Sequence, residues 1–301
     1  MFWEHRNLLG AGERLRVETE LGLKLQRLQT TFRKPDFFSR KQSLLGDAEA
    51  KKENTDSYDS QSASTGLGVE RQLAPGLTSS LGLAYRYARI QEEDEPEQNY
   101  GLVSIPAKLD WDFSNDLLNP SRGGRLALSA APYQDTLGAE RRFLKSRITH
   151  SRYIRLLDRP RTVLALRGSL GSLVGTSREE VPADERFYAG GGGSVRGIPN
   201  QLAGPLDDDD KPEGGRSLIE LSTELRFRIT ESFGAVAFLD GGTVSSSSLP
   251  SLDEELHWGF GPGLRYFTPI GPLRLDVGFP LSRRDGVDDL FQLYLSIGQA
   301  F

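Results

Sequence analysis

Four consecutive glycines and a single arginine mark the stretch Phe187-Tyr188-Ala189-Gly190-Gly191-Gly192-Gly193-Ser194-Val195-Arg196-Gly197-Ile198-Pro199-Asn200. It lies in a segment from about 175 to 215 that has no strand periodicity and is far longer than an ordinary connection. Glycine tolerates positive φ and close backbone approach, so such a segment can fold back tightly on itself. Arg196, held on that segment, can make bidentate bonds to carboxylates. Taken alone, the stretch also allows a flexible linker.

Strand periodicity begins on both sides of this segment. Apolar and polar side chains alternate over 219–229, and similarly over 13–21 and 291–301. A two-residue period places one set of side chains on each face of a β-strand. Further strands are predicted over 2–7, a stretch ending near 33, 41–54, 58–72, 77–87, 99–111, 125–133, 138–156 and 161–173. Short turns at 231–234 and 270–272 separate the strands predicted after 229. We therefore predict an all-β fold with about fifteen strands.

The composition narrows the class of protein. The chain of 301 residues has no cysteine, which excludes disulfide and thiolate chemistry, and it has no run of roughly twenty apolar residues that would form a membrane-spanning helix. His5, His150 and His257 have no metal-ligand spacing. A formal net charge of −5 argues against a general nucleic-acid binder. We expect no enzyme, no cofactor and no metal site.

Short turns alternate with longer polar loops, which lie near 91–97, 175–215 and 245–253. This rhythm is typical of outer-membrane barrels, whose periplasmic turns are brief and whose outer loops are long. A soluble β-sandwich also alternates, but it rarely needs so many strands in one series. We predict a transmembrane antiparallel β-barrel domain over residues 1–301, in the outer membrane of a Gram-negative bacterium.

The predicted strand number is odd, whereas bacterial single-chain barrels have even numbers of strands. Residues 2–7 have the pattern of the end of a strand, and no signal peptide precedes Phe2. We therefore expect a fragment of a longer exported protein, in which one more N-terminal strand would complete sixteen.

Several motifs follow one another in a fixed order. They are Asn119-Pro120-Ser121-Arg122-Gly123, Phe187-Tyr188-Ala189-Gly190-Gly191, Val195-Arg196-Gly197-Ile198, Ser222-Thr223-Glu224-Leu225-Arg226, Phe238-Leu239-Asp240-Gly241-Gly242 and Ile270-Gly271-Pro272-Leu273-Arg274. With these motifs the whole chain resembles the outer-membrane-protein assembly superfamily, and most closely the outer-membrane subunit of the translocation and assembly module (TamA type). Val195-Arg196-Gly197 is similar to the signature of that family's sixth extracellular loop, where Ile198 stands in place of an aromatic residue. Glu224 and Asp240 are similar to the acidic residues of its strands 12 and 13.

A lock between the loop and the barrel wall is predicted from these residues. Glu224 and Asp240 lie on the polar faces of neighbouring strands, so both carboxylates point into the lumen, where Arg196 can bridge them. The alternative is that both carboxylates merely line a wet pore. Because the arginine-bearing loop is present, we favour a loop-6 lock made of Val195, Arg196, Gly197, Glu224 and Asp240.

The resemblance also assigns a targeting role to the last strand. Its residues are Phe291, Leu293, Leu295, Ile297, Gly298 and Phe301. We expect the apolar face of this strand to meet lipid along its length and Phe301 to direct the chain to the barrel-assembly machinery.

The activity that the resemblance implies is the insertion or export of β-barrel clients, such as autotransporters, through a lateral seam between the first and last strands. The implied partners are unfolded outer-membrane protein clients, an inner-membrane-anchored module subunit and outer-membrane lipid. The family carries POTRA domains before the barrel, and we expect them to be absent from this chain. The alternatives are a two-partner secretion transporter, which is a pore for an exported polypeptide, and a passive porin or barrel enzyme.

Two other features have simple interpretations. Asp207–Asp210 followed by Lys211 lack the ligand spacing of a calcium loop and indicate a solvated loop. Trp3, Trp111 and Trp258 are predicted to lie at the membrane interfaces rather than to form a binding platform.

Overall fold

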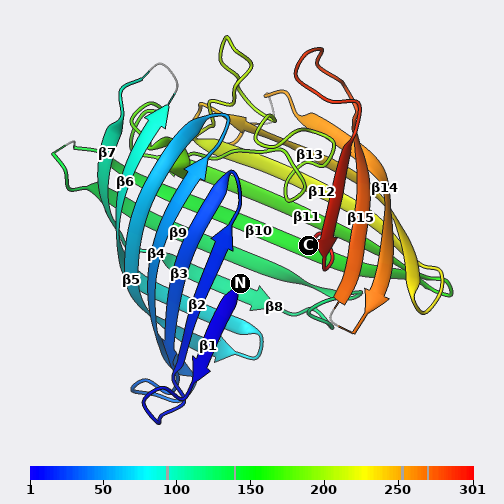
Figure 1. The fold of residues 1–301 in the computed structure, drawn as a ribbon. Helices are drawn as coiled ribbons and strands as arrows, with labels where there is room; N and C mark the ends of the chain where they lie inside the picture. Colours follow the sequence, from blue (N-terminus) through cyan, green and yellow to red (C-terminus); the bar gives the residue numbers. More distant parts are fainter. Residues whose placement is uncertain (93–94, 139, 252–253, 270) are drawn as a thin grey trace. The chain divides into compact units, whose positions relative to one another are not determined.

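The structure is a computed structural model that describes residues 1–92, 95–138, 140–251, 254–269 and 271–301. Its strands form an antiparallel sheet (Figure 1). They are β1 (Phe2–Arg6), β2 (Arg14–Leu21), β3 (Leu25–Lys34), β4 (Gln42–Asn54), β5 (Tyr58–Ala74), β6 (Leu77–Glu92), β7 (Gln98–Ser104), β8 (Ala107–Asp112), β9 (Gly123–Asp135), β10 (Arg142–Asp158), β11 (Arg161–Val174), β12 (Ser217–Arg228), β13 (Phe233–Ser245), β14 (His257–Thr268), β15 (Gly271–Pro280) and β16 (Gln292–Ile297). A short 3-10 helix, η1 (Ala183–Glu185), lies between β11 and β12. Among the described residues, no helix is long and apolar enough to cross a membrane.

The strands follow one another in the sheet in chain order, with one interruption. β7 and β8 share a single place, because β6 pairs with both of them and both pair with β9. Pro106 lies in the gap between them and has no N–H to donate to a neighbouring strand. The sixteen labelled strands thus occupy fifteen places. This confirms the predicted number of strands, although the single strand predicted over 99–111 is divided in two.

The chain forms two compact units. Unit 1 comprises Met1–Trp111, Leu128–Ser146 and Leu173–Arg186, and unit 2 comprises Asp112–Ala127, Arg147–Ser172 and Phe187–Phe301. The long loop between β11 and β12, residues 175–216, has its first part in unit 1 and its second part in unit 2. In unit 2, β12 pairs with β13 along its whole length.

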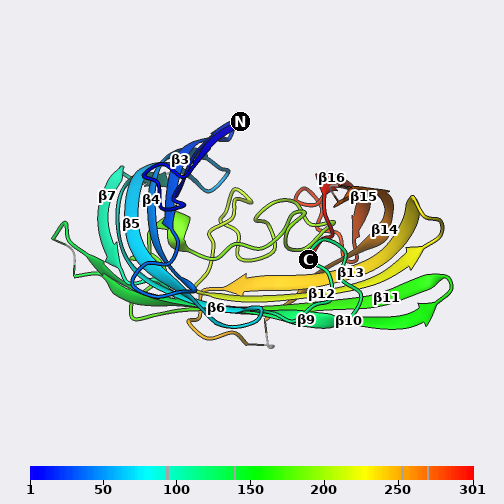
Figure 2. The ribbon, with the colours of Figure 1, turned by 90° about the horizontal axis from the view of Figure 1, so that it is seen from below.

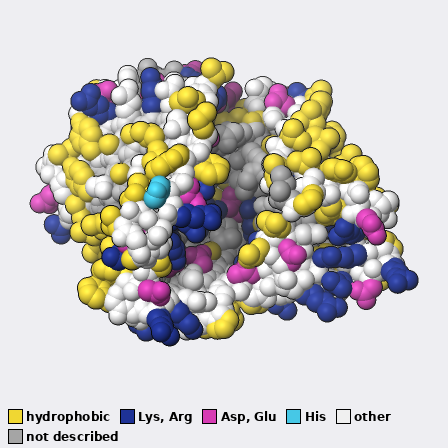
Figure 3. All heavy atoms as spheres, turned by 60° about the horizontal axis from the view of Figure 1, so that its bottom comes forward, with side chains coloured by type: hydrophobic (Ala, Val, Ile, Leu, Met, Phe, Trp, Pro, Cys, Tyr) yellow, Lys and Arg dark blue, Asp and Glu magenta, His cyan; other side chains and the backbone are white. Residues whose placement is uncertain are grey.

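Burial along the strands of unit 2 is inverted relative to that of a soluble protein. On β12, Glu224 is fully buried, whereas Leu221 on the opposite face is 41% exposed. On β13, Asp240 is fully buried and the neighbouring Leu239 is 42% exposed. Exposed leucines and buried carboxylates suit a sheet with hydrocarbon on one face and a polar interior on the other. In Figure 3, hydrophobic side chains form broad groups on the molecular surface.

The end of the last strand differs from the prediction. Leu293, Leu295 and Ile297 are exposed, but β16 ends at Ile297, and Gly298 has a φ of +101°. Phe301 then packs against a buried cluster of side chains from β10 and β11. The prediction that the apolar face of the strand extends to Phe301 is therefore wrong, because the turn at Gly298 ends the two-residue alternation.

Other boundaries differ little from those predicted. The strand expected from 138 begins at Arg142, and β6 continues to Glu92, inside the loop predicted at 91–97. Three predicted connections fall partly outside the described residues, namely 91–97 at 93–94, 245–253 at 252–253 and 270–272 at 270.

A hydrogen-bonded turn of unit 2 connects β8 to β9. Asn115 Oδ1 accepts hydrogen bonds from the backbone N–H groups of Ser121, at 2.9 Å, and Arg122, at 2.8 Å. Gly123 ends the turn with a φ of +87°, and a Cβ at this position would overlap the carbonyl oxygen of Phe113. Glycine is therefore required here both by its backbone conformation and by lack of space.

The substitution Gly123→Ala should destabilise the protein by about 2–5 kcal/mol, through backbone strain together with overpacking. Gly138→Ala is the matched control, because Gly138 has a similar φ of +96° but no atom within 4 Å of the place that a Cβ would take. Its cost should be the strain alone, about 1–2 kcal/mol. Urea unfolding of the refolded protein in detergent micelles, followed by tryptophan fluorescence, measures both, and equal losses would contradict the steric argument.

Candidate functional site

The part of the long loop that belongs to unit 2, residues 187–216, lies over the strands of that unit (Figure 2). Backbone hydrogen bonds hold it in a defined conformation. The N–H of Ala203 donates to the carbonyl of Ala189 at 2.9 Å, and the N–H of Gly191 donates to the carbonyl of Ile198 at 3.0 Å. The flexible-linker alternative therefore does not describe this loop.

Arg196 lies buried on this loop, with 2% of its side chain exposed. Its Nε and Nη2 donate to the two carboxylate oxygens of Asp240, at 2.6 Å and 3.0 Å. Its Nη1 donates to Glu224 Oε1 at 2.6 Å and to Asp276 Oδ2 at 2.8 Å. All three carboxylates are fully buried. One side chain thus joins the loop to β12, β13 and β15.

Three more arginines complete the charge cluster. Arg226 Nε donates to Glu224 Oε2 at 2.7 Å, and Arg265 Nη1 donates to Asp276 Oδ1 at 2.5 Å. Arg274 Nε lies 3.4 Å from Asp276 Oδ2. We call this set the Arg196 network; it comprises Arg196, Arg226, Arg265, Arg274, Glu224, Asp240 and Asp276.

The charge of Arg196 is stabilised in its buried position. Burial alone would lower the pKa of Arg196, but hydrogen bonding to Asp240 and the charges of Glu224 and Asp276 raise it above its ordinary value. Its guanidinium carbon also lies 3.6 Å from the ring centroid of Phe238, where a desolvated cation is attracted by the ring. The guanidinium is therefore charged, and the contact between the loop and the strands is ionic.

The loop backbone approaches the sheet closely because glycines lie beneath it. A Cβ at Gly259 on β14 would overlap the carbonyl oxygen of Arg196. A Cβ at Gly278 on β15 would lie 2.6 Å from the nitrogen of Gly197, and one at Gly242 on β13 would lie 2.9 Å from a loop side-chain atom. Side chains at these positions would hold Arg196 away from its carboxylates.

The same turn of the loop also contacts the last strand. The N–H of Gly197 donates to the hydroxyl oxygen of Tyr294 on β16 at 3.0 Å. Gly197 has a φ of +99°, and its backbone lies against that of Phe279 at the end of β15. Arg196 and Gly197 together therefore connect the buried carboxylates with β16.

The first part of the long loop is anchored within unit 1 by separate ion pairs. Arg86 on β6 pairs with both Asp184 and Glu185 of η1. Arg186 Nη1 and Nη2 donate to the carboxylate of Glu92 at 2.6 Å and 2.9 Å. None of these residues figured in the sequence-based site, because pairs so far apart in the chain leave no local pattern.

The structure brings together the three charged residues of the predicted lock, Arg196, Glu224 and Asp240. Val195 and Gly197 flank the arginine in the same turn, and Val195 is fully buried. Whether the contact acts as a lock in function stays a prediction.

Sequence reasoning missed Asp276, Arg265 and Tyr294. A usable signal was present, because Arg274 and Asp276 alternate with apolar residues and so share the polar face of β15. The depth at which each charge lies depends on the register between β14, β15 and β16, which no local pattern contains.

No cluster of three or more potential metal ligands occurs within the described part of the chain. Asp207 to Asp210 are exposed, and Asp207 Oδ1 accepts backbone hydrogen bonds from Asp209 at 2.9 Å and Lys211 at 2.8 Å, which forms a turn. The arrangement around Arg196 supplies electrostatic clamping of a loop and contains no pair of nucleophile and base.

Comparison with known proteins gives one family match and several relatives. The model of the Omp85 superfamily domain matches residues 7–301. The outer membrane protein assembly factor BamA of Nitratidesulfovibrio vulgaris is 26% identical over 313 residues, which cover 98% of this chain and 39% of that protein. BamA of Neisseria meningitidis serogroup B is 27% identical over 172 residues, which cover 46% of this chain and 22% of that protein. The chain thus spans well under half the length of these relatives.

Solved structures show the same fold. BamA from Haemophilus ducreyi lacking POTRA domains 1–3 has a TM-score of 0.84 at 18% identity, covering 97% of this chain and 65% of that one. CdiB from Acinetobacter baumannii has a TM-score of 0.66 at 14% identity, covering 96% and 54%. The predicted antiparallel barrel fold is confirmed by this likeness, and the predicted outer-membrane location is confirmed together with the bacterial BamA relatives.

Replacing Arg196 by alanine should leave a folded protein whose long loop is cut readily by protease. The substitution removes the arginine that the three buried carboxylates share as a partner, and breaking a buried ion pair costs about 3–5 kcal/mol. Arg196→Lys should protect the loop only in part, because lysine keeps the charge but lacks the bidentate fork. Limited proteolysis mapped by mass spectrometry measures this.

The control for that experiment is Arg228→Ala, because Arg228 donates to the backbone carbonyl of Glu231 at 2.6 Å, away from the Arg196 network. Its loop should remain as resistant as in the unmodified protein. Resistance of the Arg196→Ala loop at the same level would show that other contacts hold the loop in place.

Gly259→Ala should expose the loop to protease even though every charge of the network is retained. The added methyl group would occupy the place of the Arg196 carbonyl oxygen, so the loop backbone would have to lift. Gly168→Ala on β11 is the matched control, since its Cβ would lie 3.8 Å from the nearest atom. A protected loop in Gly259→Ala would disprove the requirement for close approach.

Proposed function

Since the chain belongs to the Omp85 superfamily, we propose that it is the barrel of an outer-membrane factor that inserts or exports β-barrel clients. The two BamA relatives, which their names describe as outer membrane protein assembly factors, support this role. The activity needs no cofactor and no enzymatic step, because each backbone hydrogen bond that a client forms with a strand edge replaces one that it makes with water or with itself.

The observation that carries the proposal is the link from Arg196 to the last strand. Arg196 is fixed in the buried network, and Gly197 beside it binds Tyr294 on β16. If β16 moves, either the hydrogen bond between Tyr294 and Gly197 breaks or the loop moves with the strand. In this proposal the loop controls how readily the edge of β16 becomes available to a client strand.

The last strand is joined to its neighbour over a short length, which suits a seam that opens. The pairing of β15 with β16 covers 6 residue pairs, whereas β12 and β13 are joined over 12. Strand edges carry unpaired N–H and C=O groups that can template an added strand. For this reason we propose that β16 carries one edge of the lateral seam.

The narrower proposal is the translocation and assembly module type. It adds autotransporter clients, an inner-membrane-anchored subunit as partner, and POTRA domains and a further strand in the full-length protein. The order of the motifs around Arg196, Glu224 and Asp240 supports this type. Co-purification of the full-length protein with an inner-membrane subunit from cross-linked cells would test it.

A two-partner secretion pore is the second candidate, favoured by the likeness of the fold to CdiB. The two functions differ in their product. An assembly factor leaves a folded barrel in the membrane, whereas a secretion pore releases its polypeptide on the other side. Protease protection of a radiolabelled substrate in proteoliposomes separates the two outcomes.

Client assembly should slow about tenfold or more in Arg196→Ala. The substitution should weaken the anchoring of the loop by several kcal/mol. A tenfold change in rate corresponds to about 1.4 kcal/mol, which is less than that loss. Tyr294→Phe, which removes only the hydroxyl that Gly197 binds, should change the assembly rate severalfold, in proportion to one hydrogen bond. The measurement is the appearance of heat-modifiable client barrel in proteoliposomes that contain the purified protein.

Tyr266→Phe is the control for Tyr294→Phe, because Tyr266 on β14 is 46% exposed on the outer face. It should assemble clients at the unmodified rate. Normal assembly by both Arg196→Ala and Tyr294→Phe, with the loop freed, would refute the coupling between the loop and the last strand.

A further inference from the structure

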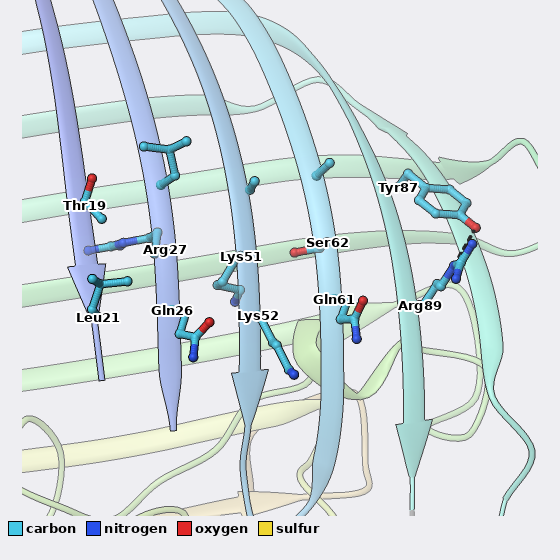
Figure 4. Close-up of a pocket in the computed structure, with 13 residues that line it drawn as sticks. Thr19, Leu21, Gln26, Arg27, Lys51, Lys52, Gln61, Ser62, Tyr87 and Arg89 are labelled. Atoms are coloured by element: carbon cyan, nitrogen blue, oxygen red, sulfur yellow. Dashed lines mark hydrogen bonds between the residues drawn. The ribbon is translucent and has the colours of Figure 1, made fainter. Parts of the chain in front are cut away.

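An open groove of about 600 Å³ lies across β2 to β6 in unit 1, well away from the Arg196 network in the sequence. Figure 4 shows the side chains that line it, contributed by all five strands. It lies on the outward side of the sheet, because Tyr87 and Arg89 in its lining alternate along β6 with Arg86, which binds η1 on the opposite side.

Two rows of different character form this groove. The first is apolar and consists of cross-strand neighbours, namely Leu28, Ala50, Ala63 and Tyr87. The second lies one step closer to the strand ends and consists of Gln26, Lys52, Gln61 and Arg89, which are also cross-strand neighbours. An apolar row bordered by a row of hydrogen-bond donors fits a molecule that has a hydrocarbon part and a polar head.

The polar row carries positive charge that the protein leaves available. Among the described residues, Lys52 has no hydrogen-bond or ion-pair partner, and Arg89 uses its Nε for a bond to the Tyr87 hydroxyl at 3.3 Å. Glu97 acts electrostatically on Arg89, but the lining of the groove contains no acidic residue. The charge therefore complements an anionic head group.

The groove lies at the strand ends that face the long loop. Ser60, next to Gln61, donates to Asp184 of η1 at 2.8 Å, and Glu92 at the end of β6 binds Arg186 of the same loop. In an outer-membrane protein whose long loops are on the outside, this end of the sheet meets the outer leaflet. The head groups there are those of lipopolysaccharide, which are phosphorylated sugars.

We propose that the groove over β2 to β6 binds lipopolysaccharide through its lipid A moiety, with acyl chains along the apolar row and phosphates at Lys52 and Arg89. The two cations are on β4 and β6, two strand spacings or about 10 Å apart. A disaccharide with a phosphate at each end spans a distance of that order, whereas a glycerophospholipid offers one phosphate. The proposal depends on the outer-membrane location and not on the assembly activity.

The test compares the double variant Lys52→Gln, Arg89→Gln with the unmodified chain in nanodiscs of neutral phosphatidylcholine. Diphosphorylated lipid A is titrated in, and binding is measured by native mass spectrometry. Near an anionic surface each cation contributes about fivefold in affinity, so the double variant should bind roughly 25-fold more weakly. Arg40→Gln, Arg71→Gln is the matched control, since it removes two exposed cations at the opposite strand ends.

Two comparison lipids make the result specific. Monophosphoryl lipid A should bind the unmodified chain more weakly than the diphosphorylated form, and phosphatidylglycerol should bind more weakly still. The proposal would be overturned if phosphatidylglycerol bound as tightly as diphosphorylated lipid A, or if the control variant lost as much affinity as the double variant. Either result would indicate a general attraction for anionic lipid. Heat-modifiability on gels verifies that each variant is folded, and the assay contains no client protein, so its failure is distinct from failure of the assembly role.

Discussion

The buried guanidinium of Arg196 joins the long loop to three strands of unit 2. Taking Arg196 out of water is costly, and the cost is recovered only if every donor meets an acceptor in good geometry. Its Nε, Nη1 and Nη2 all reach carboxylate oxygens at 2.6–3.0 Å, and these carboxylates come from three different strands. The loop, β12, β13 and β15 are thus tied to one another by a requirement of charge compensation.

This requirement has consequences for residues that carry no charge. Arg196 can reach its partners only if the loop backbone lies directly on the sheet, so Gly259 and Gly278 must lack side chains. The carboxylate of Asp276 likewise lies over Gly263, where a Cβ would overlap it. Glycine usually weakens a strand, but at these positions it leaves the space that the ionic contact between the loop and the sheet requires.

The sheet has two different faces: the leucines are exposed on one, and the charges of the Arg196 network are buried on the other. Exposed leucines such as Leu221 and Leu239 suit a face that meets hydrocarbon, and the charged residues that alternate with them are satisfied on the opposite, buried face. The groove over β2 to β6 shows a finer division on the outer face, where apolar side chains give way to Lys52 and Arg89 near the strand ends. In the proposed binding mode, opposite faces of these strands contact the lipid and the long loop.

The sequence by itself determined the strands, the polar and apolar faces and the position of the long loop, because a period of two residues and a glycine-rich segment are local properties of the chain. It also singled out Arg196, Glu224 and Asp240 by their motifs. Only the tertiary structure decided that Asp276 and Arg265 join them, that Tyr294 binds Gly197, and that Phe301 turns away from the exposed face. These contacts depend on the register of strands far apart in the chain, and a shift of two residues would leave the same alternating pattern while separating every one of them.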